Sequence, residues 1–225
     1  MTAADVHRTA PEAAPPSAGP VPGWLRLAWL YLVSRRAPAA VAVLAGLGAT
    51  AWASLHWHWD VAGGAAAKQA IPLSIETGAA MVIAVTCYGP FGEPERATGR
   101  WLPYLRLGAA VLLTAVAFGV LAAGATGGPP GGGLPYGTLA LLRNVTGMTG
   151  TGLLAAAILG GALGWAAPLV YLVLAEGALA NGATTPWAWA ARPPHDLGGA
   201  LCAGAVFTAG LLATTVRGAR ESVRD

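Results

Sequence analysis

Long stretches of this chain contain no charged residue, and this feature constrains its fold more than any other. Residues 144–175 carry no charge at all. Charged side chains make up only 10% of the chain, whereas ordinary soluble domains carry about 25%. So few charges cannot cover the surface of a water-soluble protein of 225 residues. The sequence therefore predicts an all-α, polytopic bundle of membrane-spanning helices, and it excludes a typical soluble enzyme.

Apolar segments of spanning length recur along the chain, and a span needs about 20 residues. The run 144–175 would form a helix of about 48 Å, which is too long for one crossing. Glycines 160, 161 and 164 lie near its middle and favour a tight hairpin over one long tilted helix, which is the alternative. Six spans are predicted, at residues 38–57, 69–91, 107–126, 136–160, 164–183 and 197–216.

The distribution of basic residues predicts the orientation of these spans. Cytoplasmic loops of membrane proteins are enriched in Lys and Arg. With six spans and both termini in the cytoplasm, only Lys68 and Arg192 fall on the outer side. The cytoplasmic side then holds Arg8, Arg26, Arg35, Arg36, Arg96, Arg100, Arg106, Arg217, Arg220 and Arg224. These residues lie at membrane edges rather than in one patch, so a multi-pass protein of the plasma membrane is predicted and a nucleic-acid partner is not.

The ends of the chain differ in composition from the six-span domain at residues 23–217. Residues 1–22 are rich in Ala and Pro without periodicity, which predicts a disordered cytoplasmic tail, and residues 218–225 form a second tail. Residues 24–36 combine Trp and Tyr with arginines and predict an interfacial helix, with a continuation into the first span as the alternative. Trp57, Trp59, Trp187 and Trp189 are expected at the outer interface.

Three ionisable residues, Glu76, Arg143 and Glu176, lie inside predicted spans. Such residues are costly in hydrocarbon and face a partner or a water-filled cavity. The helical rise places all three about 18–26 Å from their cytoplasmic turns, in the outer half of the membrane. We hypothesise that Arg143 pairs with Glu176, with Glu76 or with both. Such a pair is either a static clamp between helices or part of a translocation path.

The sequence contains no convincing catalytic or cofactor motif, so the chain is not expected to be an enzyme or to carry a cofactor. Ser74 lies in a predicted span, but no His lies at membrane depth to activate it. His56, His58 and Asp60 alternate with tryptophans, which favours an aromatic interface over a metal site. Cys87 and Cys202 lie in apolar runs and are interpreted as inert thiols.

The loop after the second span carries a mixed acidic and basic sequence, FGEPERATGRWLP at residues 91–103. It resembles the segment at the same place in membrane subunits of type-2 ABC exporters, where an acidic residue, an Arg and a Gly precede a helix that docks on the ATPase. The six spans, the cytoplasmic termini and the interfacial helix match that family too. The segment LRNVTGMTG at residues 142–150 is similar to small actinobacterial membrane proteins of this kind. In two respects the chain departs from the family: the docking segment is short, and no re-entrant helix is evident before the last span.

This resemblance implies a membrane (permease) subunit of an ATP-driven transporter. The chain would pair with a second membrane subunit, or with a copy of itself, and with a separate cytoplasmic ATP-binding subunit. ATP-driven closure of that subunit would open a path toward the outside. The alternative is a non-transporting scaffold or assembly protein, in which the same loop charges only fix topology. The residues that would contact the ATPase are Glu93, Glu95, Arg96 and Arg100.

Overall fold

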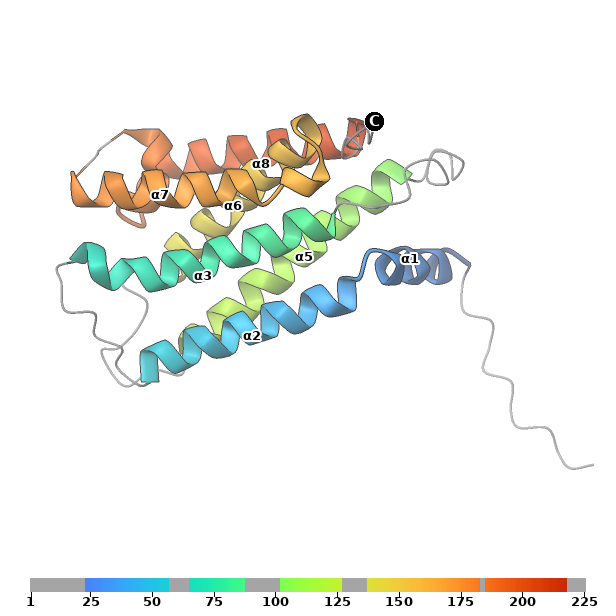
Figure 1. Cartoon of the computed structure of the whole chain (residues 1–225), viewed down its shortest axis with the longest axis horizontal. Coiled ribbons are helices and arrows are strands. Elements are labelled where there is room, and N and C mark those ends of the chain that lie inside the picture. The colour runs from blue at the N-terminus through green and yellow to red at the C-terminus, as the bar shows by residue number, and fades with distance from the viewer. Residues whose placement is uncertain (1–22, 57–64, 88–101, 127–136, 183–184, 218–225) are drawn as a thin grey trace, which may run out of the picture.

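The computed structural model describes residues 23–56, 65–87, 102–126, 137–182 and 185–217. These residues are mostly helical and include no β-strand, which confirms the predicted all-α bundle (Figure 1). The helices are α1 (Gly23–Ser34), α2 (Ala37–His56), α3 (Ala65–Thr86), α5 (Leu102–Thr126), α6 (Gly137–Ile158), α7 (Ala166–Ala180) and α8 (Leu197–Arg217). Two short 3₁₀ helices, η2 (Gly161–Leu163) and η3 (Pro186–Ala191), flank α7.

Five stretches of the described residues are long and apolar enough to cross a membrane. The helix α6 is also long enough, at 22 residues, but Arg143, Asn144 and its threonines make it less apolar. The protein is therefore a multi-pass helical membrane protein, and the prediction that α6 also crosses stays a prediction, as does the side on which the termini lie. The five stretches are Ala37–His56, Gln69–Thr86, Leu102–Thr126, Gly161–Ala180 and Leu197–Val216.

The glycines in the middle of the long uncharged run form the predicted turn. The helix α6 ends at Ile158, η2 follows, and α7 begins at Ala166. Gly160 has a φ of 103°, which a residue without a Cβ adopts without steric cost. The alternative of a single long tilted helix is therefore wrong.

The helix α1 is separate from α2, as predicted for an interfacial helix rather than a continuation of the first span. Residues 35 and 36 form a turn between them, and Figure 1 shows α1 turned away from the axis of α2. Trp29 and Leu30 on α1 are exposed. We call the end of the bundle near α1 the α1 end, and the opposite end, where η3 lies, the η3 end.

The central helices α3 and α6 contribute to both apolar cores of the bundle. One core includes Leu44, Ile83, Leu121 and Val145, and it joins α2, α3, α5 and α6. The other joins α3, α6, α7, α8 and η3, and it includes Leu73, Met148, Tyr171, Trp189 and Ala203. Most of α6 is buried, in keeping with its packing against α3, α5, α7 and α8.

Small residues let α6 and α8 approach each other closely. A Cβ added to Gly150 would lie 2.5 Å from Cα of Phe207, and one added to Gly210 would lie 2.6 Å from the carbonyl oxygen of Gly150. Because lipid tails are as apolar as the side chains, such close backbone packing is a main source of helix association in membranes. It also fixes the position of α6, which carries the polar residues described next.

Candidate functional site

A chain of buried polar side chains joins α3 to α6 in the middle of the bundle. Nδ2 of Asn144 donates a hydrogen bond of 2.9 Å to Oε2 of Glu76, and both residues are buried. Nε of Arg143 donates a longer bond, of 3.4 Å, to Oδ1 of Asn144. Asn144 therefore links the cation on α6 to the carboxyl group on α3. We call Glu76, Asn144 and Arg143 the polar cluster.

The guanidinium of Arg143 binds backbone carbonyls instead of a carboxylate. Nη1 donates to the carbonyl oxygen of Pro193 at 2.7 Å, and Nη2 donates to that of Arg192 at 2.9 Å. The predicted direct pair with a glutamate is therefore not what the structure contains. A helical side chain leans toward the N-terminus of its helix, and α6 begins at the η3 end, so the long Arg143 side chain reaches the carbonyls there.

Glu176 does not belong to the polar cluster. It is exposed on α7, and α7 ends at Ala180, earlier than the predicted end at residue 183. Glu176 thus lies about 6 Å from the end of its helix. The hypothesis that it pairs with Arg143 is wrong in this structure, because the buried face of α7 carries Tyr171, Ala175 and Ala178 instead.

The segment Pro186–Ala191, which we call the η3 cap, folds inward over the polar cluster. Nε2 of Gln69 donates to the carbonyl oxygen of Ala190 at 3.0 Å. The hydroxyl of Tyr171 donates to the carbonyl oxygen of Trp187 and accepts from the amide of Ala190, both at 3.2 Å. Gln69 and Tyr171 thus hold the η3 cap itself, and Arg143 holds the two residues that follow it, Arg192 and Pro193.

Trp189 is buried and fixes the η3 cap to the bundle, and its position at the outer membrane interface stays a prediction. It is 3% exposed and stacks on Tyr171 at 4.2 Å between ring centroids. The ring fits because residue 147 is glycine: a Cβ there would lie 2.7 Å from Cε2 of Trp189. Trp187 is 45% exposed, as an interfacial residue would be. The sequence indicated no re-entrant helix before the last span, and the structure has the short 3₁₀ helix η3 at that place.

Asp196 fastens the η3 end of α8. Its Oδ1 pairs with Nη2 of Arg192 at 2.5 Å, and its Oδ2 accepts the amide of Gly199 in the first turn of α8. The hydrogen bond from Arg192, with that from Gly199, lowers the pKa of the Asp196 carboxyl below its ordinary value. Since the carbonyl of Arg192 also binds Arg143, the polar cluster is connected to α8.

A small recess adjoins the polar cluster. A cavity of about 20 Å³ adjoins Glu76, enough for one water molecule. The polar cluster can tie helices together and hold a proton or a water, and this recess is too small for a substrate. The cavity is lined by Ala51, Ser54, Leu55, Pro72, Ile75, Glu76, Leu121 and Leu141.

Several residues singled out in the sequence lie outside the described residues. They include His58, Asp60, Trp57, Trp59, both terminal tails and the predicted docking residues Glu93, Glu95, Arg96 and Arg100. His56 stacks on Trp52 with ring centroids 4.0 Å apart. In the part of the chain that the structure describes, no three His, Cys, Asp or Glu side chains are grouped as metal ligands.

Sequence reasoning missed Asn144, Gln69 and Tyr171 as members of the site. An amide beside an arginine within an uncharged run was a usable signal for Asn144, since polar side chains in spans hydrogen-bond across helices. No local pattern marks Gln69, whose partner Ala190 lies far along the chain. This chain matches no protein-family model, no curated protein and no solved structure.

Proposed function

We propose that this chain is the membrane subunit of a type-2 ABC exporter in the plasma membrane. It works with a separate cytoplasmic ATP-binding subunit and with a second membrane subunit or a second copy of itself. The observation that carries the proposal is the order of elements: a short helix set apart from the bundle, six long helices, and an inward-folded segment before the last of them. The sequence of the loop after α3 provides the second support.

The η3 cap supports the resemblance to type-2 ABC exporters. The sequence had departed from that family because no re-entrant helix was evident before the last span. Membrane subunits of this family carry re-entrant helices in the outer loop before the last span. The η3 cap occupies the corresponding place, between α7 and α8, and Trp189 buries it in the bundle. Irregular backbone at membrane depth is tolerated only where protein or water satisfies its polar groups, and Gln69, Tyr171 and Arg143 do so here.

The helix α6 fits the role of a crossing helix despite its polar residues. Its 22 residues span about 33 Å, close to the thickness of the hydrocarbon core. Arg143 and Asn144 are buried against neighbouring helices and η3, so lipid does not meet them. Six crossings put both termini and the docking residues on one side, which is what an ATPase partner requires.

The tight packing beside the polar cluster favours a translocation path between subunits over one through this chain alone. The cavity beside Glu76 is about 20 Å³, far below the roughly 300 Å³ of a small ligand pocket. This supports a second membrane subunit as partner. The small size of this cavity also fits the alternative function, a non-transporting scaffold that only assembles other membrane proteins.

Co-purification from native membranes in mild detergent tests the proposal. An ATP-binding subunit, identified by peptide mass spectrometry and by ATP hydrolysis, should remain bound to the tagged chain. Exchanging the charges of the docking segment, Glu95→Arg with Arg96→Glu, should release it. The matched control, Arg220→Glu with Glu221→Arg, exchanges the same charges in the C-terminal tail and should retain it. If the unaltered chain retains no ATP-binding subunit, the exporter proposal is wrong and the scaffold remains.

A further inference from the structure

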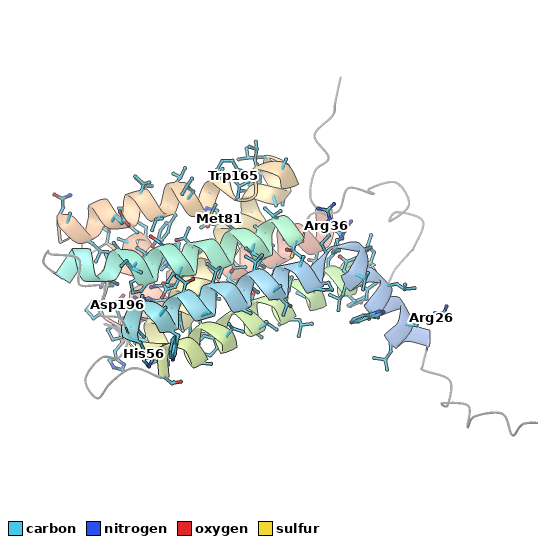
Figure 2. All side chains as sticks on the ribbon, turned by 60° about the horizontal axis from the view of Figure 1, so that its bottom comes forward. Arg26, Arg36, His56, Met81, Trp165 and Asp196 are labelled. Atoms are coloured by element: carbon cyan, nitrogen blue, oxygen red, sulfur yellow. The ribbon has the colours of Figure 1, made fainter. Side chains whose placement is uncertain are left out.

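A groove of about 680 Å³ opens at the α1 end of the bundle, and none of its lining residues belongs to the polar cluster. It lies where the turn between α1 and α2 meets the end of α3 and the start of α7. Figure 2 labels Arg36, Met81 and Trp165 on these three elements. Its size is that of pockets that hold ligands of a few hundred daltons. The lining consists of Ser34, Arg35, Arg36, Ala39, Ala40, Val43, Met81, Val82, Val85, Thr86 and Trp165.

Most of the groove is apolar, and part of that apolar surface is open. Val43 on α2 and Val85 on α3 are 50% and 47% exposed. Arg36 to Val43 covers about 10 Å along α2. A soluble anion has no methylene groups to bury, so apolar walls would not stabilise its binding. An acyl chain would bury its methylene groups against them, which favours binding.

The other end of the groove is basic. Arg35 is buried, and its Nη1 donates to the carbonyl oxygen of Cys87 at 2.6 Å, so it joins the end of α3 to the α1–α2 turn. Arg36 is exposed at the mouth. None of the lining residues carries a carboxylate, so the exposed guanidinium of Arg36 faces no negative side chain within the lining.

The backbone of Arg36 indicates that its side chain, and not merely a turn, is needed here. Its φ is 56°, in the left-handed region. A non-glycine residue is strained there, whereas glycine adopts the same conformation freely. Arg36 also begins α2, since its carbonyl oxygen accepts the amide of Ala40 at 3.0 Å. The free amides at the start of a helix attract anions; Pro38 has none, so in the first turn of α2 only those of Ala37 and Ala39 add to the field of the guanidinium.

We propose that this groove binds an anionic phospholipid. The phosphate lies against Arg36 and the first turn of α2, and one acyl chain lies along the apolar wall formed by α2 and α3. The distribution of arginines in the sequence assigns this end of the bundle to the cytoplasmic leaflet, where anionic lipids attract Lys and Arg. A bound lipid would connect α1 and α2 to α3 and α7.

Native mass spectrometry of the purified protein in neutral detergent tests this proposal. The probes are phosphatidylglycerol and phosphatidylcholine with identical acyl chains. We expect one phosphatidylglycerol to bind, at least about fivefold more tightly than phosphatidylcholine, since one arginine near an anionic headgroup contributes about 1 kcal/mol. Arg36→Gln should remove this preference, and Arg36→Gly should do so while it relieves the backbone strain.

Two further variants separate the headgroup site from the groove. Arg26→Gln removes an exposed arginine of α1 that does not line the groove, and it should leave the preference unchanged. Val43→Trp fills the groove from an exposed position and should weaken both lipids. Equal binding of the two lipids would overturn the proposal, as would an equal loss in Arg26→Gln and Arg36→Gln. Binding of glycerol phosphate as tight as that of phosphatidylglycerol would overturn the role of the acyl chain.

Discussion

Replacing Asn144 with leucine removes the side chain through which Arg143 and Glu76 are joined. The variant loses the 2.9 Å hydrogen bond to Glu76 and the 3.4 Å bond from Arg143. The longer bond is at the weak limit of hydrogen-bond geometry, so most of the effect comes from the shorter one. A buried polar group left without its partner costs about 1–3 kcal/mol, and hydrogen bonds between membrane helices reach at most about 1.7 kcal/mol. We therefore expect Asn144→Leu to lower the free energy of unfolding by about 1–2 kcal/mol.

Unfolding by SDS in detergent micelles, followed by tryptophan fluorescence, measures this change. Thr146→Val is the matched control, because Thr146 lies on the same helix and its hydroxyl donates only to the carbonyl of Leu142. That control should change the free energy of unfolding by less than about 0.5 kcal/mol.

A double variant gives the decisive comparison. Glu76→Leu together with Asn144→Leu removes both partners, so it should cost about 1 kcal/mol less than the sum of the single changes. Strict additivity would refute the bond between the two residues. A cost of Asn144→Leu no greater than that of Thr146→Val would refute it as well.

Two further predictions concern the η3 end of the bundle. Gly147→Ala should lower the free energy of unfolding by about 1–3 kcal/mol, because its Cβ would meet the Trp189 ring. The same change at Gly46, where a Cβ meets nothing within 4 Å, is the control. Asp196 has a lowered pKa, so it contributes stability above its ordinary pKa of 3.8 and loses that contribution as the pH falls through its folded value. Asp196→Asn should therefore reduce the loss of thermal stability in acid, and an unchanged pH profile would contradict this role.

The positions of the helices could be predicted because hydropathy is a local property. The predicted last span at residues 197–216 corresponds to α8, Leu197–Arg217, and the glycines between α6 and α7 indicated their turn. The predicted span at residues 164–183 is longer than α7, Ala166–Ala180, since Asn181 and Gly182 form a turn after the helix. Composition alone did not show where an apolar run stops being helical.

The partners within the candidate site could not be predicted, because they depend on how distant segments meet. Arg143 was correctly identified as a buried residue in need of partners, but its partners are the carbonyls of Arg192 and Pro193. Every residue has a backbone carbonyl, so the sequence does not show which carbonyl will accept a hydrogen bond. A glutamate is visible in the sequence, and Glu176 was therefore expected to pair with Arg143. The burial of Trp189 could not be predicted for a similar reason. Its contact with Gly147 forms only when α6 and the η3 cap pack together.

The placement of every functional element depends on six crossings, and the helix that decides this number is α6. If α6 crosses, the segments before and after it lie on opposite sides of the membrane. The η3 cap then lies on the outer side of the membrane. The docking segment and the groove lined by Arg36 lie on the cytoplasmic side. If α6 does not cross, the predicted sides of the membrane are wrong for α7, the η3 cap and α8, which follow α6.

Labelling of single cysteines in intact cells with a membrane-impermeant maleimide measures this directly. In a background with Cys87→Ala and Cys202→Ala, one cysteine replaces Gly131, before α6, and another replaces Leu159, after it. We predict that Gly131→Cys is labelled from outside, and that Leu159→Cys is labelled only after the cells are permeabilised. Equal labelling of both positions in intact cells would contradict the six-crossing bundle and the function proposed for it.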